Sequence, residues 1–423
     1  MRNTYKRILG LSFSLFLAVL VLGQEGTSPF SMYGIGNLRY QGFARNRAMG
    51  GLSSPLYSPY HLNPSNPASY SAIMQNSFIF EMGVTGNNII LKTPKKNYTD
   101  FDANVSYLSI GFPVAKWWRM GLGLIPLSSI GYNIQQEIED EVDGQSLTTL
   151  YSGEGGITNF YFDNSFKIVK SLSVGVKVSY LFGPLIYKRT SISYNENSVS
   201  RIERSDKANV SAFSYKAGIH YHKLLHENLF LNVGAAYGFN TDLSAENQTL
   251  ITNTISKTNT ILGDTLLDVT QDIGVLEIPQ SYSVGTSLSI NNKFEFGFDY
   301  SMAYWSQSKF FDKNYTFADQ SKLAFGAEYT PDVMSNKYIN LIRYRIGANI
   351  TNSYLVYEGT QLKSYEISMG FGLPVKRSPT IINFAVSYQK KYIPGIDIVE
   401  ENYLMFQLNL SLQDIWFKKR VWQ

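Results

Sequence analysis

Side chains that could act as nucleophiles, acid–base catalysts or metal ligands are scarce in this chain of 423 residues. The chain has no cysteine and only four histidines: His61, His220, His222 and His226. His220 and His222 would share one face of a strand, because side chains two residues apart point the same way. No cluster of carboxylates accompanies them. We therefore expect no metal site, no catalytic site and no cofactor.

Phosphate and nucleic-acid chemistry are also unsupported by the sequence. The glycine-rich segments are not followed by a Lys-Ser or Lys-Thr pair opening a helix, so they are interpreted as turn glycines. The formal net charge is +4, but Arg2, Lys6 and Arg7 supply three of the 37 cations, leaving 34 against 33 acidic groups. A nearly neutral chain without a basic patch is not expected to bind nucleic acid.

The clearest pattern in the sequence is strict alternation of apolar with small or polar residues. It runs through 172–182, 281–290, 294–304 and 365–373. A period of two residues predicts β-strands. In the last segment, 404–412, Leu and Phe occupy every second position. Such a stripe would aggregate in water, but it can face lipid in a closed barrel whose backbone is fully paired.

About fourteen such segments lie between residue 77 and the C-terminus. The fold class expected is therefore all-β, a transmembrane antiparallel barrel with an even strand number and both ends in the periplasm. Short turns are expected at one end, at 115–116, 170–171, 291–292 and 374–379. Long polar loops are expected at the other end, at 139–154, 191–206 and 242–263.

The same alternation places nine charged side chains inside the barrel. They are Lys177, Lys216, Glu295, Asp299, Lys322, Glu328, Arg343, Arg345 and Glu366. Five cations against four anions are nearly neutral, whereas an ion-selective pore would favour one sign. We expect hydrogen-bonded pairs that brace a plugged lumen, and a pathway for charged substrates remains the alternative.

Residues 1–24 have the features of a signal peptide. Basic residues precede an apolar run from Ile8 to Leu22, and the small residue Gly23 follows. The run is short for a membrane-spanning helix, which needs about 20 apolar residues. We therefore expect cleavage near Gln24 and export of the mature chain.

Residues 25–76 differ from the rest because they do not alternate and are rich in glycine and proline. Glycine and proline at this density indicate irregular backbone. A segment of this length is too small to form an independent domain without disulfides or metal. We expect it to fill the barrel formed by residues 77–423.

Within this segment, the run 44–51, Ala-Arg-Asn-Arg-Ala-Met-Gly-Gly, is followed by an Asn-Pro-Ala motif at 66–68. This combination resembles the N-terminal hatch of FadL-like outer-membrane transporters of long-chain fatty acids and hydrocarbons. The resemblance implies a fourteen-stranded barrel plugged by the hatch. It also implies that the hatch is positioned by Arg45, Arg47, Gly50, Gly51, Asn66, Pro67 and Ala68.

The resemblance further implies a kink in the third strand that opens a gap in the wall for lateral exit of an apolar substrate. The third strand, 117–137, contains Gly121, Gly123, Pro126 and Gly131. Proline cannot donate a hydrogen bond to a neighbouring strand. We predict the gap at Pro126, with a simple bulge near the rim as the alternative.

These observations predict an outer-membrane protein of a Gram-negative bacterium, surrounded by lipid and lipopolysaccharide, without enzymatic activity. The function expected first is passive uptake of small hydrophobic molecules such as long-chain fatty acids. The alternative is a barrel subunit of a secretion or outer-membrane assembly complex that binds proteins, as in the PorV-type members of the FadL-like group. A purely structural or adhesive barrel is a third possibility.

Overall fold

The computed structural model describes residues 27–139, 146–195, 198–257, 260–291, 293–310, 316–376 and 378–415. The predicted signal peptide, residues 1–24, lies outside these ranges. In the part of the chain that is described, no helix is both long and apolar enough to cross a membrane.

One antiparallel sheet closes on itself to form a barrel of 14 strands. Ten of these are single elements: β2 (Ser77–Lys92), β3 (Asn97–Pro113), β8 (Leu172–Asn195), β9 (Ser198–His226), β14 (Phe294–Ala303), β15 (Gln320–Tyr329), β16 (Arg343–Tyr357), β17 (Thr360–Pro374), β18 (Ile381–Tyr392) and β19 (Glu400–Ile415). Four are split in two: β4 (Trp118–Pro126) with β5 (Ser128–Glu139), β6 (Ser146–Gly155) with β7 (Thr158–Val169), β10 (Leu229–Gly238) with β11 (Thr241–Lys257), and β12 (Thr260–Ile278) with β13 (Ser281–Ile290). Pairing of β19 with β2, from Glu400↔Lys92 to Ile415↔Ser77, closes the ring. The predicted all-β, fourteen-stranded fold is confirmed.

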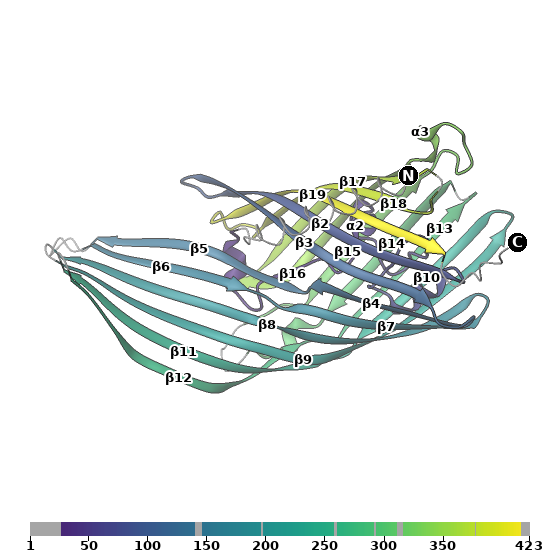
Figure 1. Cartoon of the computed structure of the whole chain (residues 1–423). Coiled ribbons are helices and arrows are strands. Elements are labelled where there is room, and N and C mark those ends of the chain that lie inside the picture. Colours follow the sequence, from purple (N-terminus) through teal and green to yellow (C-terminus); the bar gives the residue numbers. More distant parts are fainter. Residues whose placement is uncertain are drawn as a thin grey trace, which may run out of the picture.

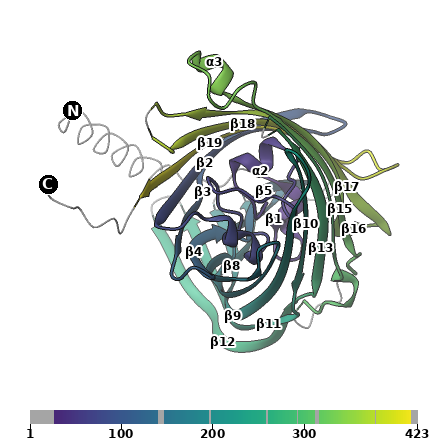
Figure 2. The ribbon, with the colours of Figure 1, turned by 90° about the vertical axis from the view of Figure 1, so that its right-hand side faces the viewer.

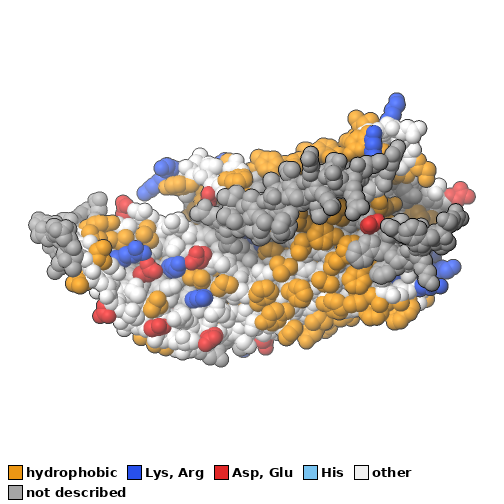
Figure 3. All heavy atoms as spheres, viewed as in Figure 1, with side chains coloured by type: hydrophobic (Ala, Val, Ile, Leu, Met, Phe, Trp, Pro, Cys, Tyr) orange, Lys and Arg blue, Asp and Glu red, His pale blue; other side chains and the backbone are white. Residues whose placement is uncertain are grey.

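The alternation in the sequence becomes two different surfaces of the barrel. In β19, Leu404, Phe406 and Leu408 point outward and are exposed, whereas Met405 and Gln407 point inward and are buried. Figure 3 shows hydrophobic side chains gathered in a broad band over the right half of the molecule. This band is the surface that a barrel presents to lipid.

The two ends of the barrel are built differently. At the turn end, on the right in Figure 1, β7–β8 and β9–β10 are joined by the short turns 170–171 and 227–228. The chain's C-terminal strand also ends there, and α3 (Tyr338–Leu341) lies in the connection between β15 and β16. At the projecting end, several strands continue well beyond the rest of the barrel.

The long polar loops expected at that end are not present as loops, and this expectation was wrong. The described residues of these polar stretches instead lengthen the strands β5, β6, β8, β9, β11 and β12. We call these six strands the projecting sheet. The longest of them, β9, has 29 residues. Thr, Ile, Val and Tyr remain frequent in these stretches and favour strands. Their polar neighbours fit a sheet that has left the lipid, and Figure 3 shows fewer hydrophobic side chains there than over the barrel.

The N-terminal residues 27–76, which we call the inner segment, lie within the ring of strands in Figure 2. They form η1 (Pro29–Met32), the short strand β1 (Asn37–Leu38), α2 (Ala44–Ala48) and η2 (Pro67–Ala72). The helix α2 contacts β16 to β19, while η2 contacts β4, β7, β8 and β9. The inner segment therefore touches opposite sides of the barrel wall.

An apolar cluster fills the space between the inner segment and the base of the projecting sheet. It joins Ile35 of the inner segment to Leu243 and Leu276 of the wall, all buried. Trp305, in η3 (Trp305–Gln307), stacks on Tyr354 with 4.5 Å between ring centroids. We call this group the outer cluster, and it covers the inner segment on the side of the projecting end.

Candidate functional site: the interface between the inner segment and the barrel wall

Inward-facing glycines allow the wall to touch the backbone of the inner segment directly. A Cβ atom on Gly347 would lie 2.1 Å from the Gly50 nitrogen, and one on Gly234 would lie 1.8 Å from the Ser54 carbonyl oxygen. No side chain fits at such distances. Backbone of the inner segment also lies against Gly175 and Gly326, and its side chains lie against Gly111, Gly121, Gly218, Gly285, Gly297 and Gly370. We call these ten residues the glycine belt.

Arg45 joins the inner segment to two strands through buried ion pairs. Its Nη2 lies 2.6 Å from Glu295 Oε2, and its Nε lies 3.2 Å from Glu328 Oε2. Burial alone would lower the pKa of Arg45, but Glu328 and Glu295 raise it above its usual value. Arg345 Nε also approaches Glu328, at 2.6 Å, and Arg343 Nη1 lies 3.9 Å from the same carboxylate.

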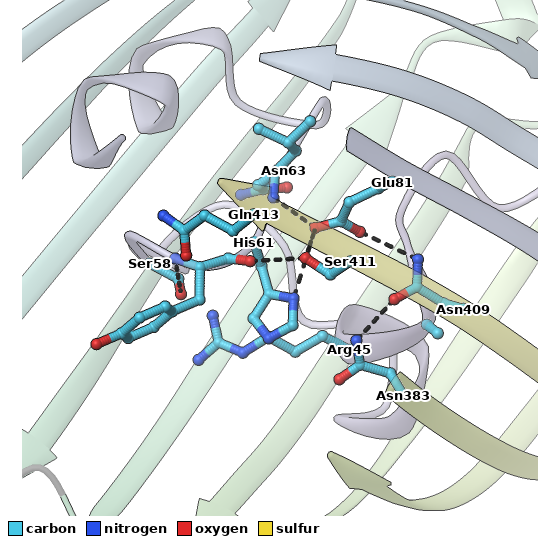
Figure 4. Close-up of polar contacts among 12 residues, drawn as sticks. Arg45, Ser58, His61, Asn63, Glu81, Asn383, Asn409, Ser411 and Gln413 are labelled. Atoms are coloured by element: carbon cyan, nitrogen blue, oxygen red, sulfur yellow. Dashed lines mark hydrogen bonds and ion pairs between the residues drawn. The ribbon is translucent and has the colours of Figure 1, made fainter. Parts of the chain in front are cut away.

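Hydrogen bonds extend this cluster along the wall. Arg345 Nη1 donates to Asn383 Oδ1 at 2.7 Å, and Asn383 donates in turn to Asn409 at 2.6 Å. Asn409 Nδ2 then donates to Glu81 at 3.2 Å, as Figure 4 shows. The line of contacts therefore runs from Arg45 in α2 through β15, β16, β18 and β19 to β2.

The other predicted inward charges divide into two groups. Asp299 accepts hydrogen bonds from the backbone amides of Ser53 and Ser54 at 2.9 and 2.7 Å. Lys177 donates to the Pro64 carbonyl and lies 3.6 Å from Asp163. These residues bind the inner segment to β8 and β14.

The second group of inward charges lies around a cavity beside the inner segment and consists of Glu366, Lys322 and Lys216. Arg47 Nη1 lies 3.6 Å from Glu366 Oε1, and Lys322 Nζ sits 4.5 Å from the centre of the Tyr40 ring. Glu366, Lys322 and Lys216 line a polar cavity of about 310 Å³ beside the inner segment. The inward charges thus mostly bind the inner segment, rather than pairing among themselves across the wall.

The residues of the Asn-Pro-Ala motif shape η2 and hold it against the wall. Asn66 Oδ1 accepts a hydrogen bond from the Ala68 amide at 3.1 Å and caps η2, which begins at Pro67. Asn66 Nδ2 donates to the Ser54 and Ile219 carbonyls, both at 3.1 Å. Near α2, Gly50 and Gly51 adopt positive φ angles of 68° and 79°, which glycine tolerates best.

His61 is buried close to the Arg45 cluster. Its Nδ1 lies 3.5 Å from Glu81 Oε1 (Figure 4). Burial, followed by the nearby charges of Arg345 and Arg45, lowers the pKa of His61 well below its usual value. His61 is therefore neutral at physiological pH.

His220 and His222 both lie against an aromatic ring. Tyr57 of the inner segment stacks on both, with centroid distances of 4.7 and 4.8 Å. His222 lines a cavity of about 490 Å³ at the turn end, together with Arg119 and Lys167. The described part of the chain holds no group of three or more metal-ligating side chains.

The third strand is interrupted at Pro126. β4 pairs with β3 as far as Leu124↔Leu108, whereas β5 pairs with β6 and, through Ser128 and Ser129, with β1. In the described ranges, no pairing joins β5 to β3. Gln41 Nε2 donates to the Pro126 carbonyl at 2.8 Å, so the inner segment borders the interruption.

An apolar cavity of about 760 Å³ lies where β3 and β5 separate. It is lined by Phe30 and Met32 of η1, Ile134 of β5 and Ile393 and Val399 of the β18–β19 connection, among others. Of the other predicted kink residues, Gly121 and Gly123 lie within paired β4, and Gly131 bonds through its carbonyl to the Ser28 amide at 2.7 Å.

Several residues of this interface were not predicted from the sequence. They are Asn383, Asn409, Glu81 and the glycine belt apart from Gly121, which was named only as a kink residue, and all occupy inward positions of their strands. Alternation alone could have placed them inside the barrel. The signal that was overlooked is glycine recurring on the inward face of strand after strand, which indicates close approach of another backbone.

Comparison with known proteins gives one family and a set of similar structures. A family model described as BamG matches residues 5–423. The toluene transporter TodX of Pseudomonas putida is 16% identical, with a TM-score of 0.62, over 90% of this chain and 100% of that chain. The CymD monoaromatic hydrocarbon channel is 15% identical, with a TM-score of 0.57, over 89% and 99%.

A FadL homologue of Pseudomonas aeruginosa is 12% identical, with a TM-score of 0.55, over 90% of this chain and 99% of that chain. No curated protein matches the chain. At these identities the similarity to TodX, CymD and the FadL homologue is one of fold. The predicted resemblance to the FadL-like barrels is confirmed at that level.

Proposed function

We propose that this chain, which belongs to the BamG family, is a barrel subunit of an outer-membrane assembly or secretion complex and binds protein partners. The observation that carries the proposal is the glycine belt, which fits the wall closely to the backbone and side chains of the inner segment. Movement of that segment would separate ten close backbone or side-chain contacts. The inner segment is therefore held rigidly inside the barrel, and this arrangement does not favour passage of a solute through the lumen.

Electrostatics support the same conclusion. Withdrawal of the inner segment would separate the buried Arg45 guanidinium from Glu295 and Glu328. Breaking a buried pair in this way costs about 3–5 kcal/mol. A gate that must open for each substrate molecule would meet this cost each time.

The projecting sheet supplies a surface on which partners can bind. With the turn end in the periplasm, as in other outer-membrane barrels, this sheet extends beyond the outer face of the membrane. Its tip bears many polar and charged side chains, in contrast to the apolar band over the barrel (Figure 3). Such an extension is not needed to conduct a small molecule.

The apolar cavity between β3 and β5 favours a second candidate function. The cavity is large enough for a small hydrophobic molecule, and it opens where the wall is unpaired. Uptake of a fatty acid or hydrocarbon would require an apolar compound to pass through this gap into the membrane. This route would bypass the inner segment without moving it.

Native mass spectrometry of the protein, purified in mild detergent from its own outer membranes, tests both functions. We expect a complex with fixed protein stoichiometry that survives an increase in salt. A monomer carrying a stoichiometric fatty acid or aromatic hydrocarbon would contradict the subunit role and support transport.

A matched pair of variants separates the two functions further. Ile134→Trp places a bulky ring at the cavity, whereas Ile350→Trp places the same ring on the exposed outer face of β16. A transporter would lose toluene uptake with Ile134→Trp and keep it with Ile350→Trp. The subunit role predicts that both variants retain their partners in equal amounts.

A further inference from the structure

One edge of the projecting sheet is an unpaired strand. β12 pairs with β11 from Thr260↔Lys257 to Ile278↔Thr241. On its other side, the described chain contributes only the Leu276↔Phe310 bridge and a hydrogen bond from the Glu277 amide to the Lys309 carbonyl at 3.0 Å. The backbone groups on this side of residues 260–275 thus have no strand partner within the described ranges.

The opposite edge of the same sheet, β5, is covered at its base. β1 pairs with β5 at Ser128 and Ser129, and the Ser28 amide donates to the Gly131 carbonyl at 2.7 Å. The inner segment therefore satisfies the base of the β5 edge. Beyond Gly131 no strand in the described ranges pairs with the outer side of β5, so both edges are open toward the tip, and β12 is the longer open edge.

β12 lacks several of the features that protect natural edge strands. Natural edges are blunted by lysine, proline or short length. The 19 residues of β12 include no lysine, arginine or proline. Instead Ile261, Leu262 and Leu266 are 75%, 63% and 56% exposed. A long, exposed, apolar edge of this kind readily accepts another strand.

The charge of β12 limits what that strand can be. Its charged residues are all acidic: Asp264, Asp268, Asp272 and Glu277. Pairing with the β12 edge of a second copy would bring acidic strands together, and like charges opposite one another are destabilising. A segment carrying lysine or arginine would instead complement the edge.

The register between β11 and β12 shows on which faces of β12 the acidic side chains lie. Thr252 pairs with Thr265 and Ile251 with Leu267, so Leu266 is an extra residue that forms a bulge. Asp264 and Asp268, four residues apart, would share a face in a regular strand, but the bulge places them on opposite faces. The incoming segment should therefore carry cations on both of its faces.

We propose that β12 is a β-augmentation site that binds an extended basic segment of a partner protein along residues 260–275. Main-chain hydrogen bonds would supply affinity, and exposed Asp264 and Asp268 would select basic sequences. This inference rests on the proposed role as a protein-binding subunit, and it names the surface that the partner occupies.

Hydrogen exchange on the isolated native complex tests the site directly. Amides of residues 261–271 are compared between the intact complex and the same protein after the partners are stripped away. We expect at least about tenfold slower exchange of alternate amides in the complex, because those amides gain strand partners. Unchanged exchange along β12 in a complex that retains its partners would overturn the site while leaving the subunit role intact.

Charge reversal provides an independent test with a matched control. The double variant Asp264→Lys, Asp268→Lys reverses the exposed charges on the open edge. The control Asp242→Lys, Glu246→Lys makes the same change on exposed positions of β11, which pairs with both β9 and β12. Both should fold, as judged by migration of the unheated barrel on SDS gels.

We expect the β12 variant to lower partner retention about tenfold at low salt and the β11 variant to leave it unchanged. Equal loss in both variants, or in neither, would contradict augmentation at β12. Absence of any fixed partner for the unmodified protein would refute the proposed function itself, so the two failures are distinguishable.

Discussion

Close contacts at single residues determine how the inner segment behaves. Gly347 and Gly234 bring strand backbone against the backbone of residues 49–54. Arg45 binds carboxylates from two neighbouring strands. Each contact restricts the inner segment from a different direction. At this scale the interior resembles a packed protein core more than a gated passage.

Alanine at a belt glycine should therefore destabilise the barrel. In Gly347→Ala, the new methyl group would lie 2.1 Å from the Gly50 nitrogen, a backbone atom that cannot move aside cheaply. Overpacking of this kind costs about 1–3 kcal/mol. Urea unfolding in detergent, followed by SDS-gel mobility, should show a lower midpoint for this variant.

Gly263→Ala is the matched control, because a Cβ atom there would meet only Thr254 Oγ1, at 3.9 Å. Its midpoint should equal that of the unmodified protein. Equal midpoints for Gly347→Ala and Gly263→Ala would mean that the inner segment yields easily and does not fit the wall closely.

Burial of neutral His61 gives the stability a defined pH dependence. The pKa of His61 is lowered in the folded barrel by burial and by Arg345 and Arg45, so below pH 6.5 the unfolded chain binds a proton that the folded chain does not. Stability should fall as the pH drops below about 6.5, by up to about 1.4 kcal/mol per pH unit from this side chain.

Urea midpoints measured from pH 7.5 to 4.5 check this effect when the protein is compared with His61→Gln, which cannot titrate. Below pH 6.5 the unmodified protein should lose stability relative to the His61→Gln variant. Parallel profiles would show that the pKa of His61 is the same in the folded and the unfolded protein, and a relative gain in stability of the unmodified protein at low pH would show that His61 is protonated in the folded barrel; either result would contradict a lowered pKa.

The projecting sheet is a separable element of the molecule. The outer cluster involves the base of the β11–β12 hairpin, at Leu243, Ala245 and Leu276, but not its tip. Joining Glu246 to Asp272, which pair directly, by a short turn would remove the tip and keep these contacts. We expect the shortened barrel to fold and insert normally but to lose its partners.

Shortening the β5–β6 hairpin between Gln136 and Thr149, which also pair, is the corresponding control at the opposite edge. Pull-down from membranes should show partner retention in this control and loss in the β11–β12 variant. Equal retention by both proteins would place the partner surface elsewhere on the barrel.

The strands could be predicted from the sequence, because each carries its own period of two. The strands at 294–304 and 404–412 can be predicted without knowing which strands lie beside them. The length of the projecting strands could not be predicted in the same way. Beyond the lipid both faces of a strand are wet, so alternation fades at 191–206 although pairing continues.

Contacts between the inner segment and the wall could not be predicted from the sequence either. Parity assigned these charges to the inward faces of the strands, but their partners depend on the path of residues 27–76, which have no regular period. Asp299, for example, binds backbone amides of Ser53 and Ser54 rather than a cation. Only the folded inner segment reveals such a partner.

Considered as a whole, the molecule combines a filled barrel with an open, one-sided extension. The outer cluster covers the inner segment on one side, and the glycine belt and the Arg45 cluster fix it within the wall. Within the described ranges, unpaired strand edges include the Pro126 interruption and β12. The central claim is that the inner segment stays in place while the exposed sheet binds partners.

Reactivity of a single introduced thiol tests that claim most directly, because the chain has no cysteine of its own. Ser54→Cys places the thiol at a fully buried position of the inner segment, and Met74→Cys places it at a position that is 40% exposed. Each variant is labelled with maleimide in detergent, with and without toluene or oleate.

We predict that the Ser54→Cys variant is labelled about a hundredfold more slowly than the Met74→Cys variant, because buried sites react only through rare opening. Neither toluene nor oleate should change the rate at position 54. Fast labelling at position 54, or acceleration by either compound, would show that the inner segment moves as a gate and would contradict the account.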